Sequence, residues 1–470
     1  MPSLKKNLFY SVLLILANYV FPFLTYPYVS RVLGVSGIGE CNFVDSIINY
    51  FVLFSSLGVN ALGVREIAKS KDDKAQLSRV FTNIFLVTLA LTALMIIVLV
   101  VVTYTVPKLY EHKDLMLIGA VKLLFNCMLV EWLFRGLEDF RLVTIRTIAV
   151  KLLYVAAVFL FVREKDDVWI YYGLISLTIV VNALINILFA RSRVRLDFSG
   201  LKLVDTFRDL LKLGVYTILT SMYTTFNVTF LGFVSGEDEV GLYTTATKIF
   251  YMVLALFTAF TNIMIPRISN VVSKGDMCQL KSFYNTALEA LFGFSFPLVL
   301  WMMLMAPDIV QLIAGREFGG AVLPMVLVSP LLFVICYEQI LVLQILLPLG
   351  HDNILLRNSI YGAIMGLCLN VALVPVLAST GSSIAWICSE TLILVLSQSV
   401  VTKELQIKFP LGKTLVNILY YIPLALLLVV CATVRYSLFV KVLISIVLVA
   451  GYCSLYQFGI RKGQLFKELK

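Results

Sequence analysis

The stretch Arg31-Val32-Leu33-Gly34-Val35-Ser36-Gly37-Ile38-Gly39, with the apolar span that leads from it to Arg65-Glu66-Ile67, decides the fold of this chain. A related pattern occurs later, with Leu231-Gly232, then Gly241, a second apolar span and Arg267-Ile268. Gly39 and Gly241 each precede their arginine by 26 residues, and the two patterns are offset by 202 residues. The spacing predicts that the two glycines and the two arginines lie at corresponding positions of two related helices, and hence that the chain is built from two related halves.

Composition places almost the whole chain in lipid. Of the 470 residues, 60% are hydrophobic and 14% are charged, with a mean hydropathy of +0.94. Soluble domains are about 45–50% apolar and about 25% charged. Most of the apolar stretches are long enough to cross a hydrocarbon core of about 30 Å. The fourteen stretches are 8–30, 42–62, 80–104, 115–134, 146–162, 168–190, 213–233, 241–265, 287–305, 323–349, 354–377, 382–401, 414–434 and 437–459. We therefore expect an all-α integral membrane protein with about fourteen transmembrane helices.

The distribution of Lys and Arg predicts the orientation. With the N-terminus inside, the inner segments carry 27 of the 38 basic residues and the outer segments carry 8. Because basic residues favour the cytoplasmic side, both termini are expected in the cytoplasm. The net charge of +10 reflects this asymmetry and attracts anionic membrane lipids. No basic stripe is interleaved with aromatic residues on a soluble face, so nucleic acid is not an expected partner.

The predicted halves are two pseudo-symmetric six-helix lobes joined by an amphipathic segment. The expected domains are an N-terminal lobe over 1–195, an amphipathic interfacial linker over 196–212, a C-terminal lobe over 213–402, and two further helices with a cytoplasmic tail over 403–470. An even number of spans precedes the linker, so both lobes enter the membrane from the same side. Repeats of this kind enclose a cavity between them, as in many transporters.

Charged side chains inside the predicted spans are the first candidates for function, because each costs at least about 3 kcal/mol near the bilayer centre. Lys122 and Lys248 lie about 10 Å inside their spans, too deep to reach the surface easily. Glu338 and Glu390 are also deep. For these four side chains we favour a site that faces a water-filled interior over structural ion pairs.

Asp45 nearly coincides with Lys248 under the 202-residue offset. Corresponding helices approach each other across the pseudo-symmetry axis, so the two side chains could meet and form a gate. The alternative, that they face different cavity walls, is equally open. Asp45, Glu338 and Glu390 are therefore the candidates for gating or coupling.

The remaining polar residues point to contacts with substrate rather than to catalysis. Tyr19 and Tyr223 lie deep in the first helix of each half, where they could contact carbohydrate, although tyrosines near helix ends are ordinarily interfacial. The eight cysteines show no CxxC and no metal-ligand spacing. His112 and His351 are predicted on opposite sides of the membrane and cannot form a dyad. We expect no catalytic residue, no metal site and no organic cofactor.

The N-terminal pattern resembles that of polysaccharide flippases. Arg31-Val32-Leu33-Gly34, Gly37-Ile38-Gly39 and the helix end Gly63-Val64-Arg65-Glu66-Ile67-Ala68 are similar to the start of Wzx-type members of the multidrug/oligosaccharidyl-lipid/polysaccharide (MOP) exporter superfamily. The resemblance implies a MOP-type transporter in a bacterial cytoplasmic (inner) membrane. Its expected activity is to move undecaprenyl-diphosphate-linked oligosaccharide, a repeat of O-antigen, capsule or exopolysaccharide, from the inner to the outer leaflet by alternating access.

The resemblance also implies site residues and partners. The family's cavity is lined by cations, and Arg31, Lys122 and Lys248 are the cations best placed here to meet the diphosphate. Coupling to an H+ or Na+ gradient is expected, as are partners among polysaccharide polymerase and chain-length machinery. The first helix lacks the arginine cluster of the lipid II branch, which argues against lipid II as substrate.

Two other functions remain to be compared with this one. A multidrug or cation antiporter of the same superfamily is compatible with the composition, although the three deep bases disfavour cationic drugs. A membrane glycosyltransferase or polymerase belongs to a different class. Such an enzyme needs a sizeable loop to hold its substrates, and no predicted loop is that long. The expectation is therefore a transporter and not an enzyme.

Overall fold

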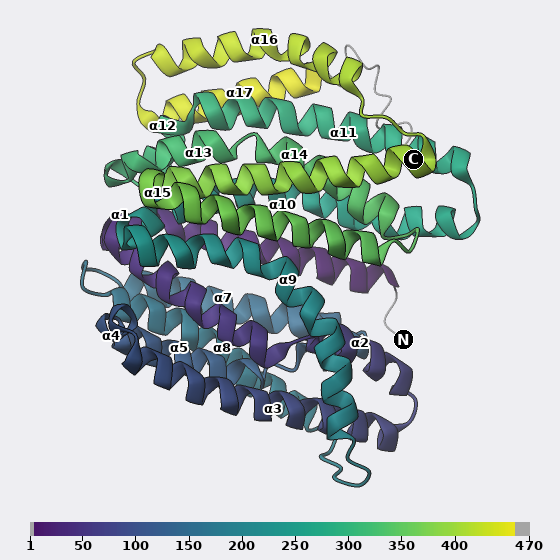
Figure 1. The fold of residues 1–470 in the computed structure, drawn as a ribbon. Helices are drawn as coiled ribbons and strands as arrows, with labels where there is room; N and C mark the ends of the chain where they lie inside the picture. The colour runs from purple at the N-terminus through teal and green to yellow at the C-terminus, as the bar shows by residue number, and fades with distance from the viewer. Residues whose placement is uncertain (1–3, 456–470) are drawn as a thin grey trace. The chain divides into compact units, whose positions relative to one another are not determined.

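Helices form all the regular secondary structure of residues 4–455, which are the residues that the computed structural model describes (Figure 1). Within these helices the side chains at 4–9, 11, 12, 15, 16, 18–20, 215–224, 263, 266 and 273 are not described. The expected all-α class is confirmed. The chain divides into two compact units, Met1–Gly241 and Leu242–Lys470.

Each unit is a set of long helices with shorter ones between them. The first unit contains α1 (Leu4–Ser56), α2 (Val59–Ser70), α3 (Lys74–Thr105), α4 (Pro107–Glu111), α5 (Lys113–Asn126), α6 (Glu131–Gly136), α7 (Phe140–Phe161), α8 (Val168–Ala190), α9 (Leu203–Ser235) and the start of α10 (Glu237–Ser273). The second unit contains the rest of α10, α11 (Met277–Leu304), α12 (Ala306–Ile313), the 3-10 helix η1 (Arg316–Ala321), α13 (Val322–Val328), α14 (Leu331–Gln339), the π-helix η2 (Ile340–Leu346), α15 (Asp352–Leu405), α16 (Leu411–Thr433) and α17 (Leu438–Leu455).

Many of these helices can cross a membrane. In the part of the chain that is described, ten helices are long and apolar enough, or eleven if the bent pair Arg316–Val328 and Leu331–Leu346 is one span. The number is below fourteen partly because α1 covers 8–30 and most of 42–62, and α15 contains both 354–377 and 382–401. A multi-pass membrane architecture is confirmed, and the count of fourteen stays a prediction.

The two merged helices change direction at single residues. α1 departs from helical geometry at Gly34, whose φ of 70° is readily adopted by glycine. α15 departs at Ala378, with a φ of 47°. Pro330 lies at the break between α13 and α14, where the helix direction changes by 46°, as its missing N–H predicts.

Two predicted helices differ from the observed ones. The stretch 115–134 is interrupted between α5 and α6, where Val130 takes a left-handed conformation (φ 35°). The linker 196–212 is helical only from Leu203, and this part continues directly into the rest of α9. Residues up to Lys202 stay outside the helix because hydrogen bonds to α3, such as the Lys202 N–H donating to Asn83 Oδ1 at 2.7 Å, hold them against that helix. The compact units also divide after Gly241 rather than at this linker.

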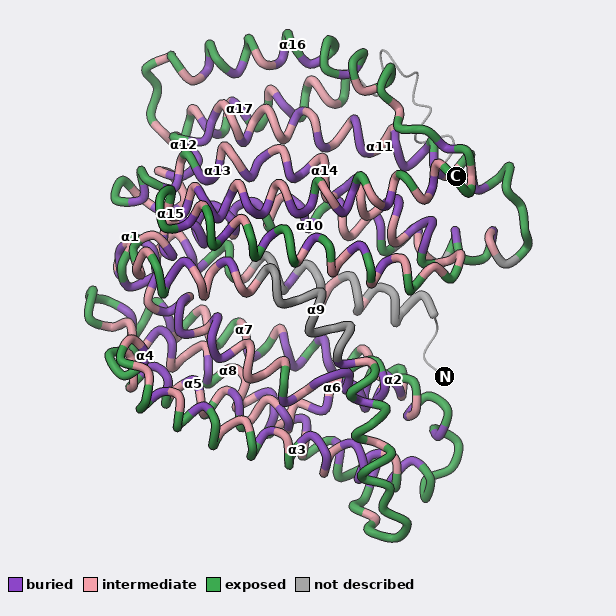
Figure 2. The backbone as a smooth tube through the Cα atoms, in the orientation of Figure 1, coloured by how far each residue is buried: buried purple, intermediate pink, exposed green. Residues whose placement is uncertain are grey.

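Packing within each unit is helix on helix. In the first unit α1 lies against α3, α5, α7 and α9, and α5 lies against α8. In the second unit α11 packs against α14, α16 and α17, while α15 packs against α13 and α14. Figure 2 shows that exposed residues predominate along α16, between single buried ones, and the exposed side chains include Leu419, Leu426 and Val430. Apolar surface on this scale suits contact with lipid rather than water.

Candidate functional site

The first candidate site is an ion pair inside the first unit. Asp45 lies on α1 and Lys122 on α5, and Lys122 Nζ is 2.6 Å from Asp45 Oδ1. The Lys122 side chain is 12% exposed and that of Asp45 is 30% exposed. Both residues were predicted as site residues, one as a cavity cation and the other as a gate. Their direct contact was not predicted.

Neutral side chains complete this pair, and we call the four residues the Asp45 cluster: Asp45, Asn49, Lys122 and Tyr172. The Tyr172 hydroxyl, from α8, donates to Asp45 Oδ1 at 3.1 Å. Asn49 Nδ2 donates to Asp45 Oδ2 at 3.2 Å, and Lys122 Nζ donates to Asn49 Oδ1 at 3.3 Å. The carboxylate therefore keeps two neutral donors even when the ammonium turns elsewhere, so Lys122 can exchange Asp45 for another anion.

A close helix approach explains why the Asp45 cluster forms. Gly119 lies on α5 one turn before Lys122, and a Cβ atom there would be 2.5 Å from Ile48 Cγ1 on α1. Such a distance is well inside van der Waals contact, so a side chain at this position would push α5 away from α1. Glycine thus allows the charged side chains of the two helices to reach each other.

A second buried charge network holds the break between α5 and α6. Arg146 on α7 is 6% exposed, donates to Glu131 Oε1 at 3.0 Å, and also donates to Asn186. Asn186 in turn donates to the carbonyl of Leu129, one of the groups that the break leaves without a helical partner. Arg146 was not among the predicted site residues, because it lies at the very start of its predicted stretch, 146–162.

The third site is a pair of acids in the second unit. Glu338 on α14 is hydrogen-bonded to Glu390 on α15. Glu390 is 4% exposed and also accepts from Trp386 Nε1 at 3.0 Å. Among the described groups, Glu338 Oε2 is buried without a hydrogen-bond partner. Both acids were predicted as coupling candidates, and the structure places them together. A hydrogen bond between two carboxyl groups contains a proton, because a carboxylate cannot donate.

The other predicted residues are more scattered. Arg31 is exposed and donates to the carbonyl of Pro27 in its own helix. Lys248 is half-buried on α10 in the second unit. The side chains of Tyr19 and Tyr223 lie outside the described residues. Asp45 and Lys248 belong to different units, so their pairing stays a prediction.

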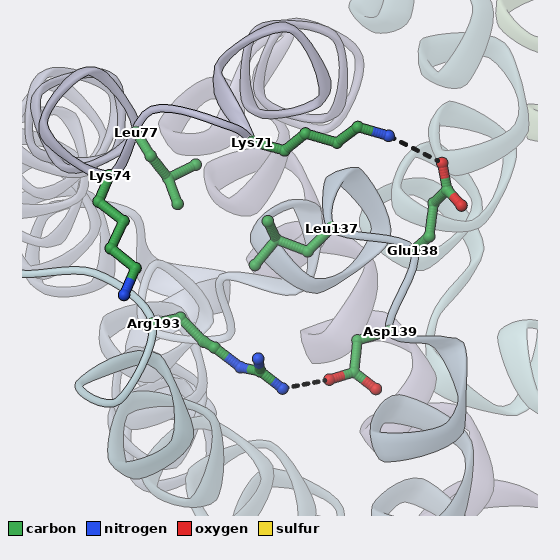
Figure 3. Close-up of a pocket in the computed structure, with 7 residues that line it drawn as sticks. All are labelled: Lys71, Lys74, Leu77, Leu137, Glu138, Asp139 and Arg193. Atoms are coloured by element: carbon green, nitrogen blue, oxygen red, sulfur yellow. Dashed lines mark hydrogen bonds and ion pairs between the residues drawn. The ribbon is translucent and has the colours of Figure 1, made fainter. Parts of the chain in front are cut away.

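A pocket of about 410 Å³ opens beside α3 in the first unit (Figure 3). Its charged lining consists of Lys71, Lys74, Glu138, Asp139 and Arg193. Lys71 lies 3.7 Å from Glu138, and Arg193 lies 3.2 Å from Asp139. The opposite charges nearly cancel, so we do not assign an anion site to this pocket. In the described chain, no group of three His, Cys, Asp or Glu side chains is placed to hold a metal ion.

Comparison with known proteins defines the family. A family model described as polysaccharide biosynthesis protein matches residues 4–272, more than half of the chain. The chain belongs to this polysaccharide biosynthesis protein family. A protein of Escherichia coli (strain K12) named as an O-antigen transporter is 28% identical over 407 residues, which cover 83% of this chain and 95% of the relative. A protein of Shigella dysenteriae with the same name is 25% identical over 395 residues, covering 83% and 98%.

Solved structures share the fold of this family member. The lipid II flippase MurJ in an inward closed conformation matches with a TM-score of 0.74 at 13% identity, over 96% of this chain and 99% of that one. An outward-facing multidrug resistance MATE transporter of the MOP superfamily matches with a TM-score of 0.60 at 16% identity, over 86% and 96%. The predicted resemblance to polysaccharide transporters is confirmed by the family match and the relatives, and the chain has the fold of MOP-superfamily transporters. The relatives and structural neighbours are named transporters and flippases, not enzymes.

Proposed function

We propose that the protein flips lipid-linked oligosaccharides, the polyprenyl-diphosphate-bound repeats of O-antigen, capsule or exopolysaccharide, from the inner to the outer leaflet of the cytoplasmic membrane. The observation that carries the proposal is the family match, together with relatives named for O-antigen transport that align with 83% of this chain. The proposed orientation has both termini in the cytoplasm, as the excess of basic residues in the inner segments indicates.

The Asp45 cluster supports a role in holding the diphosphate. In the proposed cycle the diphosphate competes with the Asp45 carboxylate for the Lys122 ammonium, a point charge well suited to phosphate. The exchange is feasible because Tyr172 and Asn49 still donate to Asp45 when Lys122 leaves it. Arg31 and Lys248 are the further cations proposed to meet the substrate.

Alternating access driven by a cation gradient is the second part of the proposal. Glu338 and Glu390 supply its chemistry, because two adjacent carboxyl groups hold a proton in one arrangement and release it when they separate. Glu390→Gln keeps the shape of the pair but removes one titrating group. The variant should therefore reach normal membrane levels and lose most of its export, and normal export would exclude this pair from coupling. If Na+ rather than H+ is the coupling ion, export should instead depend on the sodium concentration.

The test of flipping is deletion of the gene in its host. Surface polysaccharide should disappear and lipid-linked repeats should accumulate in the inner leaflet, and the native gene should restore both. Polysaccharide that still reaches the surface would refute the proposal. Deletion that instead raises only sensitivity to cationic drugs would favour the multidrug antiporter. Partnership with polymerase and chain-length machinery is proposed on the same basis and would appear as co-purification.

Site residues are tested in the same host. Lys122→Ala should reduce export strongly, and Lys122→Arg should retain more, because the charge matters more than its shape. Lys113→Ala is the matched control: Lys113 is on the same helix, and its ammonium lies 4.9 Å from the centre of the Tyr110 ring. Equal export by Lys122→Ala and Lys113→Ala would rule out the phosphate contact.

A further inference from the structure

The two glycines that define the sequence repeat meet each other in the first unit. A Cβ atom on Gly39 of α1 would be 1.8 Å from the carbonyl oxygen of Glu237 and 3.0 Å from the backbone nitrogen of Gly241. A Cβ atom on Gly241 would be 2.3 Å from the carbonyl oxygen of Val35. The backbones of α1 and of the first turn of α10 are therefore in direct contact, which only glycine at both positions allows.

A histidine joins the same two backbones. His112, between α4 and α5, has Nδ1 at 3.0 Å from Glu40 Oε1 and Nε2 at 3.2 Å from Glu237 Oε1. Glu40 directly follows Gly39 on α1, and Glu237 begins α10. Lys108 of α4 also contacts Glu237 Oε1, at 2.9 Å. We call Glu40, Lys108, His112 and Glu237 the outer clasp, because the predicted topology puts all four on the outer side of the membrane.

The chemistry of the outer clasp depends on one proton. Neutral imidazole has a single N–H and can donate to only one carboxylate, whereas imidazolium donates from both nitrogens. Both observed partners of His112 are carboxylate oxygens. The two contacts therefore exist together as hydrogen bonds only when His112 is protonated.

We propose that the outer clasp is a proton-operated latch: protonated His112 holds α1 against the start of α10, and loss of the proton releases them. The proposal rests on the proposed alternating-access cycle, in which the outer side opens to release the lipid-linked substrate. Opening separates Glu40 from Glu237, so one of the two carboxylates leaves the imidazole. A proton is then bound on closing and released outside on opening.

The groups around His112 favour its protonated form while the outer clasp is closed. The hydrogen bond that His112 donates to Glu40 raises the pKa of His112 more than its partial burial lowers it, and Glu237 raises it further. Lys108 offsets part of the Glu237 charge. The other charged residues within four positions of an outer-clasp residue along the chain are Glu111, Lys113, Asp114, Asp238 and Glu239. A raised pKa in the closed form means that the latch is fully formed below the unperturbed pKa of about 6.5 and weakens as the pH rises through the higher folded value.

The test measures how often the contact opens. Val240, which is 0% exposed beside Gly241, is changed to Cys in a full-length chain whose eight native cysteines are replaced by alanine. Labelling by a membrane-impermeant maleimide in intact cells is divided by the labelling of a Ser36→Cys control. Ser36 is exposed on α1, so the ratio cancels the pH dependence of the thiol itself. The ratio should rise about fivefold from about pH 6 to about pH 8.

Three variants decide the outcome. With His112→Ala the ratio should be high at both pH values, and with His112→Arg, which carries a fixed charge with several donors, it should be low at both. His351→Ala is the matched control, since His351 pairs with Glu404 at 2.6 Å in the second unit, and it should leave the rise unchanged. The latch would be refuted if the labelling ratio still rose with pH in the His112→Ala variant. It would also be refuted if Val240→Cys were never labelled.

A second measurement avoids the cysteine replacements. Hydrogen exchange of the peptide spanning residues 33–41 in the otherwise native chain should be slower at low pH with His112 than with His112→Ala. Neither readout uses substrate, so they separate this proposal from the proposed function. A labelling ratio that does not change with pH, together with normal export, would refute the latch but not the proposed function. Surface polysaccharide that persists after gene deletion would refute the proposed function, whatever the labelling shows.

Discussion

Replacing one member of the Asp45–Lys122 pair leaves the other charge unpaired in the membrane interior. The structure indicates which of the two replacements lowers the free energy of unfolding more. Lys122 is 12% exposed, and Asn49 Oδ1 at 3.3 Å is its acceptor besides Asp45. Asp45 is 30% exposed and keeps the donors Tyr172 and Asn49. Breaking a fully buried pair costs about 3–5 kcal/mol. We expect Asp45→Asn to cost about 3 kcal/mol, and Lys122→Met about 1–2 kcal/mol because water and two donors still reach the carboxylate.

A double-mutant cycle tests this reasoning. The free energy of unfolding is measured by SDS titration in mixed micelles for the native chain, the two single variants and the double variant. The double variant should lose about 2 kcal/mol less than the sum of the single losses, since it leaves no unpaired charge. The same cycle with Lys248→Met serves as the comparison and tests the predicted Asp45–Lys248 gate. The assigned pairing would be refuted if the Asp45→Asn and Lys122→Met losses in the free energy of unfolding were additive. It would also be refuted if the coupling of Asp45 to Lys248 were larger than its coupling to Lys122.

Further predictions concern the described contacts and the predicted topology. Gly39→Ala should lower the free energy of unfolding by about 3 kcal/mol, because its Cβ would meet the Glu237 carbonyl at 1.8 Å. Gly173→Ala, with nothing within 4 Å, should instead stabilise its helix by about 0.5–1 kcal/mol. The pKa of His112 is raised in the folded chain. His112→Ala should therefore lower the free energy of unfolding by about 1–2 kcal/mol below about pH 6, and this loss should fade as the pH rises. A difference between the two chains that stays constant across pH in urea or SDS titrations would contradict this. Reporter fusions after Ser235 should report the outside and those after Ser273 the inside, and a reversal at either site would contradict the predicted topology and the repeat.

Several features could be predicted because they depend on local chemistry. Proline at 330 lacks an N–H, so its residue type favours a helix break at this position, although Pro297 lies inside α11. Glu338 and Glu390 were singled out since a charge within an apolar span is costly wherever the span packs. The repeat spacing identified Gly39 and Gly241 as equivalent positions, although it did not show that they touch.

Other features depend on how helices cross, which no local pattern contains. Arg146 satisfies groups freed by the α5–α6 break, and that break requires Val130 in a left-handed conformation that its β-branched side chain disfavours. That the two histidines form no dyad stays a prediction. The partners of His112, however, are Glu40 and Glu237, which are 72 and 125 residues away.

Residue type and order alone were enough to predict an all-helical membrane protein, because hydropathy depends on nothing else, and the two related halves stay a prediction from the repeat spacing. Tertiary structure decided which charges compensate each other. Lys122 was predicted as a free cavity cation, yet α1 and α5 approach closely enough at Gly119 for Asp45 to neutralise it across 77 residues of sequence. A buried charge takes whichever opposite charge the helix packing brings within about 3–4 Å, and that distance is fixed by side-chain volumes at the helix interface rather than by position in the chain.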